Sequence, residues 1–505
     1  MADEHLDVLI VGAGLSGVAA GYYMQTKCPG RSYAIVEGRA SSGGTWDLFR
    51  YPGIRSDSDM YTLGFSFRPW QEAKGLADGP AILRYIRQTA SEFGIDRKIR
   101  YQHRVKRASW STREARWSVE IERADGQEPV RLTCNFLFMC CGYYDYAAGY
   151  TPELPGIERF QGKVVHPQNW TPDVEYANKR VVVIGSGATA VTLIPALAGD
   201  AAHVTMLQRS PSYVVARPDR DPIGEKLRQH LPSKTAHTMI RWRNVLFGMY
   251  FYNVARRRPQ QAKEFIINGV RAALGPSFDV DKHFRPRYNP WDQRMCVVPN
   301  GDLFTALRTG QASVVTDEIE TFTERGIKLR SGAELEADLI VTATGLNLVV
   351  AGDVQLSVDG TATDFPSTMT YKGMMFSDVP NFAVATGYTN ASWTLKCELT
   401  CEYVCRMLNH MEKTGDRQCT PRNLDSSVLP EERPDLNSGY VLRTLHKFPK
   451  QGTKHPWKVY QNYARDLLTF RFGKLHDGIM EFSNRATRDK SRKVRTGGQP
   501  ELPLS

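Results

Sequence analysis

The amino-acid sequence predicts an α/β fold in which two Rossmann-like dinucleotide-binding domains are combined with a helical subdomain. Two glycine-rich turns support this fold, one after the apolar run at 7–11 and the other after the apolar run at 180–184. Two further apolar runs end in Ala-Thr-Gly at 345 and 387, as strands that close over a nucleotide domain do. A chain of 505 residues also exceeds what one hydrophobic core supports, so we expect several domains.

The first turn, at 12–17, has the glycine spacing of a dinucleotide-binding loop. Gly12 permits the tight turn after the strand, Gly14 lets a pyrophosphate approach the backbone, and Gly17 lets the following helix pack closely. The next apolar run ends at Glu37, where an acid would bind ribose hydroxyls. Strand, turn, helix and second strand therefore follow one another in the order that nucleotide binding requires.

The second turn repeats this pattern with one informative change. Gly185 and Gly187 occupy the first two glycine positions, and Ala190 takes the third. The apolar run at 203–208 then ends in Arg209, a base where the first loop has an acid. Because a base at this place can pair with a 2′-phosphate, the sequence predicts NADPH in preference to NADH. The alternative is that Arg209 is a solvated charge at a strand end.

Two such turns indicate two dinucleotides, a prosthetic flavin and a nicotinamide, with hydride passing between them. We therefore expect the NADP domain to be inserted in the FAD domain. The predicted segments are the first part of the FAD-binding domain at 1–150, the NADP-binding domain at 151–350 with a helical insertion at about 215–285, the return to the FAD-binding domain at 351–484, and a basic flexible tail at 485–505.

The cysteines exclude several kinds of site. Nine of them are scattered along the chain, which is no disulfide framework and favours a reducing, cytoplasmic location. Cys397, Cys401 and Cys405 share one helical face. Because no C-x-x-C pair or clustered histidines accompany them, they predict a buried apolar stripe and no metal site.

The charge balance favours a polyanionic partner without choosing among nucleic acid, an anionic membrane and a phosphorylated small molecule. Basic residues exceed acidic ones by 11, and the sequence pI is about 9.1. Residues 485–495 alone contain six bases against one acid. No zinc-ligand spacing or RNA-binding aromatic signature supports nucleic acid, and the N-terminus carries no secretory signal.

Residues 244–255 (NVLFGMYFYNVA) form an uncharged, aromatic-rich stretch between Arg241, Arg243 and the arginines at 256–258. The stretch is too short to cross a bilayer. We interpret it as a helix that lines a substrate entrance or the core, and Trp393 as another candidate for the substrate pocket. The alternative is peripheral membrane contact through 241–258.

Two longer motifs lie between and beside the turns. The first is GTWDLFRYPGIRSD at 44–57, and the second is FQGKVVHPQNW, with Phe160, Gly162, His166 and Trp170 at its fixed positions. Both resemble the class B flavoprotein monooxygenases. Trp170 resembles the Baeyer–Villiger branch, because the N- and S-oxygenating branch usually has Tyr or Phe there.

The chain departs from strict Baeyer–Villiger members at Thr171, where they usually carry Pro or Asp. This departure, the 505-residue length and the motif NPWDQR at 289–294 make the chain similar to the ethionamide-monooxygenase-like subgroup, which oxidises both ketones and sulfides. The resemblance implies FAD and NADPH as cofactors. It also implies conversion of ketones to esters or lactones by O2 through a C4a-peroxyflavin, and oxidation of sulfides.

The resemblance places the catalytic arginine at Arg294 and the acid that holds it at Asp57. A guanidinium suits this task because it keeps its proton and presents several donors in a rigid fork. From spacing alone, the two residues would be an ordinary structural ion pair or far apart. Asp292 is a candidate accessory charge.

The resemblance and the turns together assign the cofactor-contacting residues: Gly12, Gly14, Gly17, Glu37, Gly44, Trp46, Asp57, Gly185, Gly187, Thr189, Ala190, Gln208 and Arg209. His166 is implied to couple the domains and not to transfer protons. Gln293 stands where many members have Lys before the catalytic arginine, so the preference for NADPH is expected to be weaker than usual.

Two alternatives stay open. The first is a flavin-containing N- or S-monooxygenase of amines and thioethers, which would share every cofactor motif. The second, from another class, is a peripheral membrane-binding flavoprotein without Baeyer–Villiger activity. The expected partners are a small-molecule ketone or sulfide and O2, with no nucleic acid and no metal.

Overall fold

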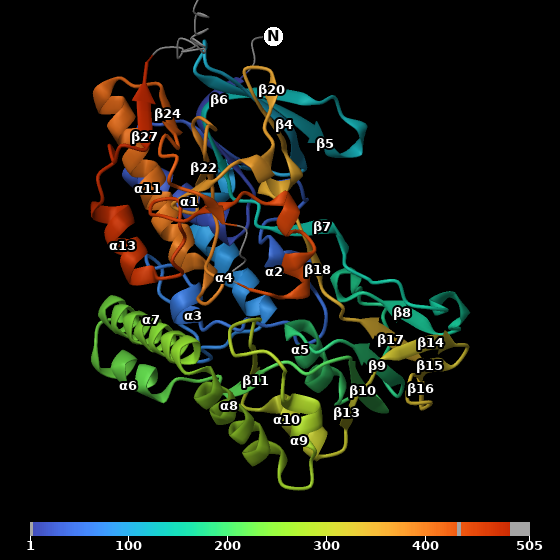
Figure 1. Cartoon of the computed structure of the whole chain (residues 1–505). Helices are drawn as coiled ribbons and strands as arrows, with labels where there is room; N and C mark the ends of the chain where they lie inside the picture. Colours follow the sequence, from blue (N-terminus) through green and yellow to red (C-terminus); the bar gives the residue numbers. More distant parts are fainter. Residues whose placement is uncertain (1–3, 432–435, 485–505) are drawn as a thin grey trace, which may run out of the picture.

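A computed structural model describes residues 4–431 and 436–484, and it arranges them in two sheet-containing parts with a group of helices below (Figure 1). The α/β fold class with a helical subdomain, predicted from the two glycine-rich turns, is confirmed. The predicted basic tail at 485–505 lies outside the described residues. The predicted domain boundaries stay predictions.

The first part is built on a mixed sheet that contains strand β1 (Glu4–Val11). β1 pairs in parallel with β2 (Tyr33–Val36) on one side and β6 (Val130–Met139) on the other. β23 (Phe382–Val384) returns from the last third of the chain and pairs in parallel with β6. The sheet is extended by β3 (Ile99–Arg100), β4 (His103–Ser111), β5 (Arg116–Arg123), β19 (Gln355–Val358) and β20 (Thr361–Ala362).

β1 is apolar throughout its second half because both faces of the sheet are covered. Val8 and Ile10 lie in a core shared with α1 (Leu15–Lys27), α4 (Gly79–Glu92) and α11 (Trp393–Thr414). Leu9 and Val11 face the opposite core, which contains Trp117 and its neighbours on β4 and β5. The three cysteines of α11 are buried in the first of these cores, which confirms the predicted apolar stripe.

The second part contains a fully parallel sheet in the order β13-β10-β9-β17-β8. Its strands are β8 (Lys163–Val165), β9 (Arg180–Ile184), β10 (His203–Gln208), β13 (Ala312–Thr316) and β17 (Leu339–Thr342). Helices α5 (Ala188–Leu197) and α10 (Asp302–Arg308) pack on it. A small antiparallel sheet packs against one face of it and consists of β14 (Ile319–Thr323), β15 (Gly326–Leu329) and β16 (Glu334–Glu336).

The helical subdomain follows β10 and consists of α6 (Pro222–His230), α7 (Ser233–Arg257), α8 (Pro259–Leu274) and α9 (Val280–Phe284). α7 includes the whole 244–255 stretch. Its inner face is buried at Val245 and Ala255, whereas Leu246, Phe247 and Tyr250 are exposed. The expectation that this stretch lines the core or an entrance therefore describes only one face of the helix.

Arg241 differs from the flanking arginines with which the sequence groups it. Its side chain is only 7% exposed and pairs with buried Glu398 of α11 at 2.7 Å. The same guanidinium donates hydrogen bonds to the carbonyl oxygens of Tyr61 (2.9 Å) and Gly64 (2.8 Å). Arg241 thus fastens α7 to the first part of the molecule.

The two sheet-containing parts are joined by two antiparallel strands, β7 (Tyr144–Gly149) and β18 (Leu346–Leu348). The chain also forms the short helices α2 (Thr45–Leu48), α3 (Met60–Leu63) and α12 (Gly439–Leu442), and the paired strands β11 (Val214–Arg217) and β12 (Cys296–Pro299). The remaining elements are β21 (Thr370–Tyr371), β22 (Met375–Phe376), β24 (Gln418–Pro421), β25 (Pro430–Glu431), β26 (Gln451–Gly452), α13 (Tyr463–Phe472) and β27 (Met480–Ser483). Within the described residues, no helix is long and apolar enough to cross a membrane.

Candidate active site

A cavity of about 900 Å³ lies where the two sheet-containing parts meet. Both glycine-rich turns line it, together with the connecting strands, α2 and the 436–445 region that includes α12. This volume lies at the upper end of the range for small-molecule and cofactor sites. Each site residue predicted from the sequence can therefore be described by whether it lines this cavity.

At the first turn, the glycines make a cradle that side chains would fill. Gly12 has φ +104°, and a Cβ there would come within 2.7 Å of the Cys140 carbonyl oxygen. A Cβ on Gly17 would come within 1.8 Å of the Gly12 oxygen, so α1 can approach β1 only with glycine at this place. Gly12 and Gly14 line the cavity. α1 begins there with no side-chain cap and no acid in its first turn, which leaves its N–H groups for an anion.

Glu37 follows β2 and lines the same cavity. Its carboxylate accepts hydrogen bonds from the backbone N–H groups of Ala13 at 2.8 Å and Arg39 at 2.9 Å. Burial raises the pKa of Glu37 above its ordinary value, against the effect of these two donors. Glu37 is thus held in place beside the first turn, where the sequence predicts contact with a ribose.

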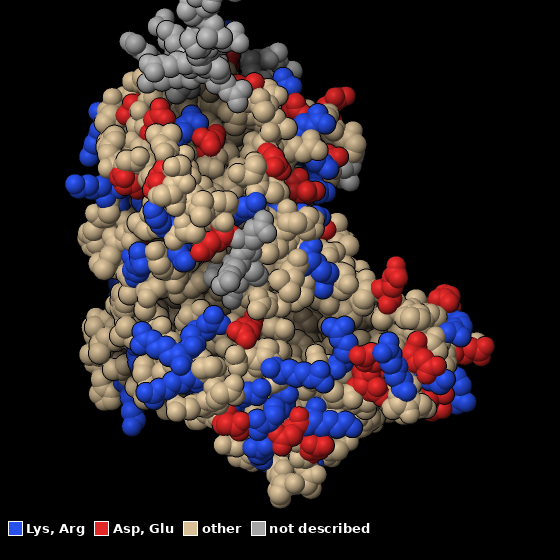
Figure 2. Space-filling view, viewed as in Figure 1, with Lys and Arg blue, Asp and Glu red and all other residues tan. Residues whose placement is uncertain are grey.

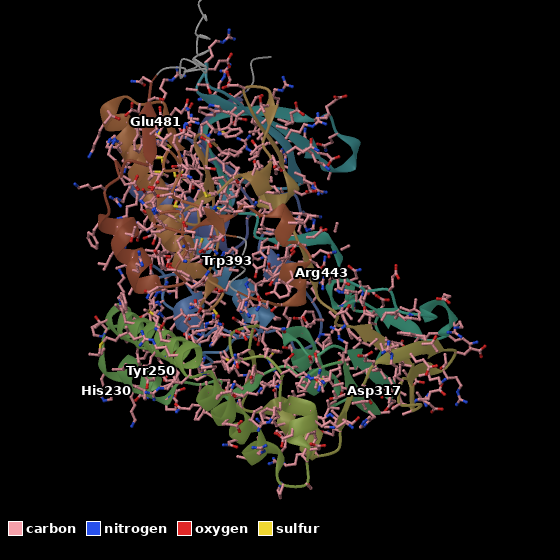
Figure 3. All side chains as sticks on the ribbon, in the orientation of Figure 1. His230, Tyr250, Asp317, Trp393, Arg443 and Glu481 are labelled. Atoms are coloured by element: carbon pink, nitrogen blue, oxygen red, sulfur yellow. The ribbon has the colours of Figure 1, made fainter. Side chains whose placement is uncertain are left out.

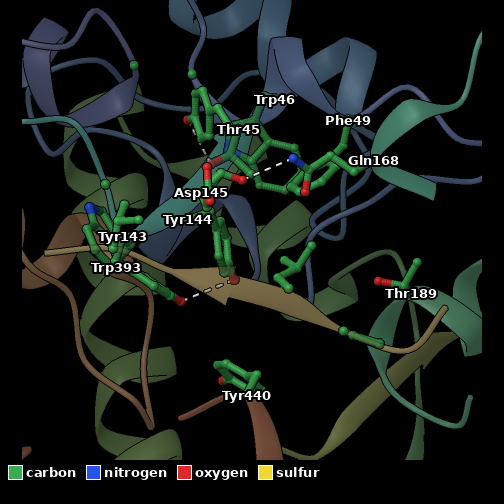
Figure 4. Close-up of a pocket in the computed structure, with 18 of the residues that line it drawn as sticks. Thr45, Trp46, Phe49, Tyr143, Tyr144, Asp145, Gln168, Thr189, Trp393 and Tyr440 are labelled. Carbon is green, nitrogen blue, oxygen red and sulfur yellow. Dashed lines mark hydrogen bonds between the residues drawn. The ribbon is translucent and has the colours of Figure 1, made fainter. Parts of the chain in front are cut away.

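Gly44 and Trp46 complete the first half of the cavity wall. Gly44 has φ +56°, and a Cβ on it would lie 3.1 Å from the Cα of Gly14, so the two glycines face each other. Trp46 lies on α2 beside Thr45, whose hydroxyl is 3.4 Å from that of Tyr146 (Figure 4).

The second turn has the same construction on β9. Gly185 has φ +135°, and a Cβ would come within 2.4 Å of the Ala343 carbonyl oxygen. In front of Gly187 the space is open, since a Cβ there would meet no atom within 4 Å. α5 also begins with no side-chain cap and no acid in its first turn. Gly185, Gly187, Thr189 and exposed Arg209 line the cavity.

The structure does not bring every assigned cofactor residue into this cavity. Gln208 is 2% exposed, and its amide nitrogen donates to the His283 carbonyl oxygen at 2.7 Å and to the Thr316 hydroxyl at 2.9 Å. Gly17 and Ala190 are buried and contribute to helix packing. A direct contact of the Gln208 side chain with a cofactor therefore remains a sequence prediction that the geometry does not favour.

Arg294 and Asp57 meet in the cavity although 237 positions of sequence, 57 to 294, separate them. The Arg294 Nε lies 3.6 Å from the Asp57 Oδ2, which is an ion pair beyond hydrogen-bond length. Burial raises the pKa of Asp57, opposed by the positive charges of Arg294 and Arg55. Burial also opposes the charge on Arg294, but Asp57, Tyr143 and Tyr144 more than offset this and raise its pKa. Arg294 therefore stays charged.

The loop before Arg294 is fixed by its own side chains. Trp291 has φ +68°, an unusual conformation for a bulky residue. Asp292 accepts a hydrogen bond from the Asn289 backbone N–H at 3.0 Å and pairs with Arg256 at 2.9 Å. Its backbone oxygen accepts from the Asn437 N–H at 2.6 Å. Asp292 does not line the cavity. Its contacts favour a role in positioning the loop over the role of accessory charge that the sequence suggests.

Four aromatic side chains form the wall between the two turns (Figure 4). The Tyr143 ring stacks on Trp393 with centroids 5.1 Å apart, and the hydroxyls of Tyr143 and Tyr144 are 3.2 Å apart. Trp393 donates from Nε1 to the Ser16 hydroxyl at 2.8 Å. Tyr440 lies across the opening from them. Burial raises the pKa of Tyr143 and of Tyr144, so both remain phenols at neutral pH.

Sequence reasoning named only Trp393 among these aromatic residues. A signal for Tyr143 and Tyr144 existed, because they directly follow the apolar run that ends in Cys-Cys-Gly at 142. Strand ends of this kind carry binding residues in nucleotide folds. Tyr440 lies in the four-residue helix α12 and Arg443 directly follows it, far along the chain, and no local pattern marks them.

His166 lies at the crossing between the two parts. Its Nδ1 accepts the Gln168 backbone N–H at 3.1 Å, which leaves its Nε2 to donate to the Gly345 carbonyl oxygen at 3.1 Å. Burial lowers its pKa. A Cβ on Gly149 would come within 2.0 Å of the ring, so His166 fills the place that this glycine leaves on β7. These contacts tie the linker strands together and support the coupling role that the resemblance implies.

The other fingerprint residues lie away from the cavity. Phe160 and Trp170 are both 8% exposed and belong to the cores on the two faces of the parallel sheet. Gly162 lies under the Phe160 ring, since a Cβ there would come within 2.5 Å of it. Gln168 donates from Nε2 to the Asp145 carbonyl oxygen at 3.0 Å (Figure 4). Among residues 4–431 and 436–484, no group of three metal-ligating side chains occurs.

Comparison with known proteins identifies the family of the chain. Residues 72–270 match the flavin-binding monooxygenase-like family, and residues 10–78 match the NAD(P)-binding Rossmann-like domain. The chain is 54% identical over 485 residues to the FAD-containing monooxygenase EthA of Mycobacterium tuberculosis, covering 95% of this chain and 98% of that one. It is 51% identical over 481 residues to EthA of Mycolicibacterium smegmatis, covering 95% and 97%.

Among solved structures, the chain is similar to an oxidised steroid monooxygenase bound to NADP, with a TM-score of 0.69, 25% identity, and coverage of 83% of this chain and 87% of that one. An open cyclohexanone monooxygenase shares the fold, with a TM-score of 0.68 at 21% identity, covering 83% and 90%. The resemblance found in the motifs at 44–57 and 160–170 is thereby confirmed. The chain belongs to the family of FAD-containing, flavin-binding monooxygenases.

Proposed function

We propose that this protein is an FAD-containing, NADPH- and O2-dependent monooxygenase that converts ketones to esters or lactones by the flavin-peroxide route, and that it also oxidises sulfides. The observation that carries the proposal is that two dinucleotide turns and the Arg294–Asp57 pair line one cavity. An enzyme that passes hydride between two dinucleotides and then oxidises a third molecule needs both dinucleotides and the reacting groups beside one cavity.

The cavity residues fit both cofactors. At the first turn, the facing glycines Gly14 and Gly44 and the uncapped start of α1 suit the pyrophosphate of FAD, with Glu37 beside its ribose. At the second turn, open space before Gly187 suits the pyrophosphate of NADPH, and Arg209 suits its 2′-phosphate. When bound, FAD supplies the activation of O2 for the reaction.

Arg294 would stabilise negative charge that develops on oxygen near the aromatic wall. Its ion pair with Asp57 orients the guanidinium, and at 3.6 Å the pair leaves other N–H groups of the fork for substrate or cofactor oxygens. Its raised pKa means that it does not release a proton to an anionic oxygen at neutral pH. The neutral phenols of Tyr143 and Tyr144 line the same space without adding negative charge.

The protein would work in a reducing compartment. All nine cysteines lie in the described part of the chain, and each is a free thiol there. This supports the cytoplasmic location predicted from their scattered spacing.

The test uses purified protein supplied with FAD and NADPH. We expect an oxidised flavin spectrum that NADPH bleaches and air restores, and lactone from a cyclic ketone as well as sulfoxide from a thioether. Sulfoxide without any lactone would favour the N- and S-oxygenating alternative and overturn the ketone assignment. Protein that binds no flavin would overturn the proposal as a whole.

A further inference from the structure

Helix α7 carries an exposed apolar face that the described structure leaves uncovered. Met239, Leu246, Phe247 and Tyr250 are 48–69% exposed, and Ile223 at the start of α6 is 61% exposed. Met239, Leu246 and Tyr250 are spaced at seven and four residues, so they follow one line along the helix. We call these five side chains the α7 patch.

The charged residues of α7 are all of one sign. α7 itself contains Lys234, Arg241, Arg243, Arg256 and Arg257 and no acidic residue. Lys234 near its start and Arg257 and Arg258 at its end are exposed. Figure 2 shows Lys and Arg gathered over α7 at the lower left of the face shown. Figure 3 places Tyr250 and His230 on this side, apart from Trp393 and Arg443 at the centre.

The opposite face of α7 reaches the wall of the cavity. Val245 forms a small buried core with Tyr388 and Leu395, and Trp242 and Met249 pack on the same core beside Ala391. Tyr388 and Ala391 line the cavity. Helix α7, about 10–12 Å across with its side chains, and the wall residues Tyr388 and Ala391 therefore lie between the α7 patch and the cavity.

We propose that the α7 patch docks on a lipid surface with anionic headgroups, with α7 lying in the plane of the interface. Large apolar side chains between basic residues are typical of helices that bind in this way. Anionic lipids attract the basic residues at both ends of α7, while Met239, Leu246, Phe247 and Tyr250 enter the acyl boundary. A second copy of the chain would oppose like charge with like charge, which disfavours self-association through this face.

This placement gives the monooxygenase access to substrates dissolved in lipid. An apolar ketone or sulfide concentrated in the bilayer would lie close to the cavity wall at Tyr388 and Ala391. This consequence relies on the proposed function, whereas docking itself does not. Lipid binding is therefore measured separately from turnover.

The test is sedimentation of the FAD-loaded, full-length protein with sucrose-filled vesicles of phosphatidylcholine, with and without phosphatidylglycerol. We expect binding to the anionic vesicles that weakens as salt rises. The variant Leu246→Glu/Phe247→Glu should bind at least tenfold more weakly. Lys234→Gln/Arg257→Gln should lose about fivefold for each charge removed, on anionic vesicles only.

Leu424→Glu is the matched control, because Leu424 is 84% exposed and lies outside α7. It should bind like the wild type, and all variants should keep their flavin and their rate with a water-soluble ketone. Wild-type protein that stays in the supernatant, or equal loss in Leu424→Glu, would overturn the proposal. A concentration-dependent dimer that Leu246→Glu/Phe247→Glu abolishes would identify a second copy as the occupant and overturn it too.

Discussion

Replacing Arg241 by methionine tests how the helical subdomain is held against the rest of the molecule. The guanidinium pairs with Glu398 at 2.7 Å, and both side chains are at most 7% exposed. It also donates to backbone oxygens of Tyr61 and Gly64. Removing one partner of a buried pair costs about 3–5 kcal/mol, because the other charge is left unpaired.

The expected result of Arg241→Met is local opening of α7. Burial already raises the pKa of Glu398 above its usual value with Arg241 present, so the lone carboxyl would take up a proton. A loss of about 3 kcal/mol corresponds to roughly 100-fold faster hydrogen exchange of α7 amides. Exchange followed by mass spectrometry measures this directly, peptide by peptide.

Two comparisons make this prediction refutable. Arg257→Met, at an exposed position of the same helix, should leave the exchange of α7 unchanged. Arg241→Met/Glu398→Met should recover most of the loss, because a buried pair replaced by apolar residues is about neutral. If Arg241→Met exchanges no faster than Arg257→Met, then the buried pair does not hold α7.

Three other predictions concern the cofactor turn and the effect of pH. Gly187→Val should fold and keep its flavin, because its side chain enters open space, but it should raise the KM for NADPH at least tenfold by filling the pyrophosphate position. Arg209→Gln should lower the ratio of kcat/KM for NADPH to that for NADH by at least tenfold, since a charged hydrogen bond contributes about 1.5–3 kcal/mol; an unchanged ratio would refute the 2′-phosphate assignment. Burial lowers the pKa of His237 to about 4, and neither ring nitrogen has a hydrogen-bond partner among the described residues. The unfolded chain therefore binds a proton that the native protein does not, so stability is full above pH 6.5 and falls as the pH drops toward 4, by about 2 kcal/mol at pH 5. Thermal unfolding of His237→Leu at pH 7 and pH 5 should show a smaller pH effect than wild type; an equal effect would contradict this reading of His237.

The cofactor turns could be predicted from sequence because their constraints are local. Gly12 and Gly185 follow buried strands and adopt positive φ where a Cβ would strike a neighbouring strand. Such requirements appear in the sequence as glycine at fixed spacing. Glu37 and Arg209 are likewise set by the strand ends that precede them.

The meeting of Arg294 with Asp57 could not be derived from spacing, because it depends on how two sheets pack together. The resemblance to a family supplied it. Tyr440 lies in a short helix and Arg443 at its end, and the place of this helix follows only from the folded chain. Gln208 shows the limit of a motif match, since its predicted cofactor contact stays a prediction while its amide is engaged in the interior.

The sequence shows the aromatic-rich stretch of α7, but it does not show which side of the helix is buried and which is exposed. Arg241 and Arg243 are two residues apart, yet one is buried in an ion pair and the other is half-buried beside Asp221. Which arginine turns inward depends on a carboxylate of α11, more than 150 positions away in the sequence. Local charge counting cannot resolve this.

The central claim is that the protein oxidises a ketone in this cavity and that Arg294 stabilises the negative charge that develops on oxygen. The variant Arg294→Ala tests this claim most directly. Ester formation and the reduction of flavin by NADPH would be measured on the same preparation, with Arg113→Ala as a control at a position 88% exposed. We expect ester formation to fall about 100- to 1000-fold while NADPH still reduces the flavin. Ester formation within tenfold of the wild-type rate would contradict the account.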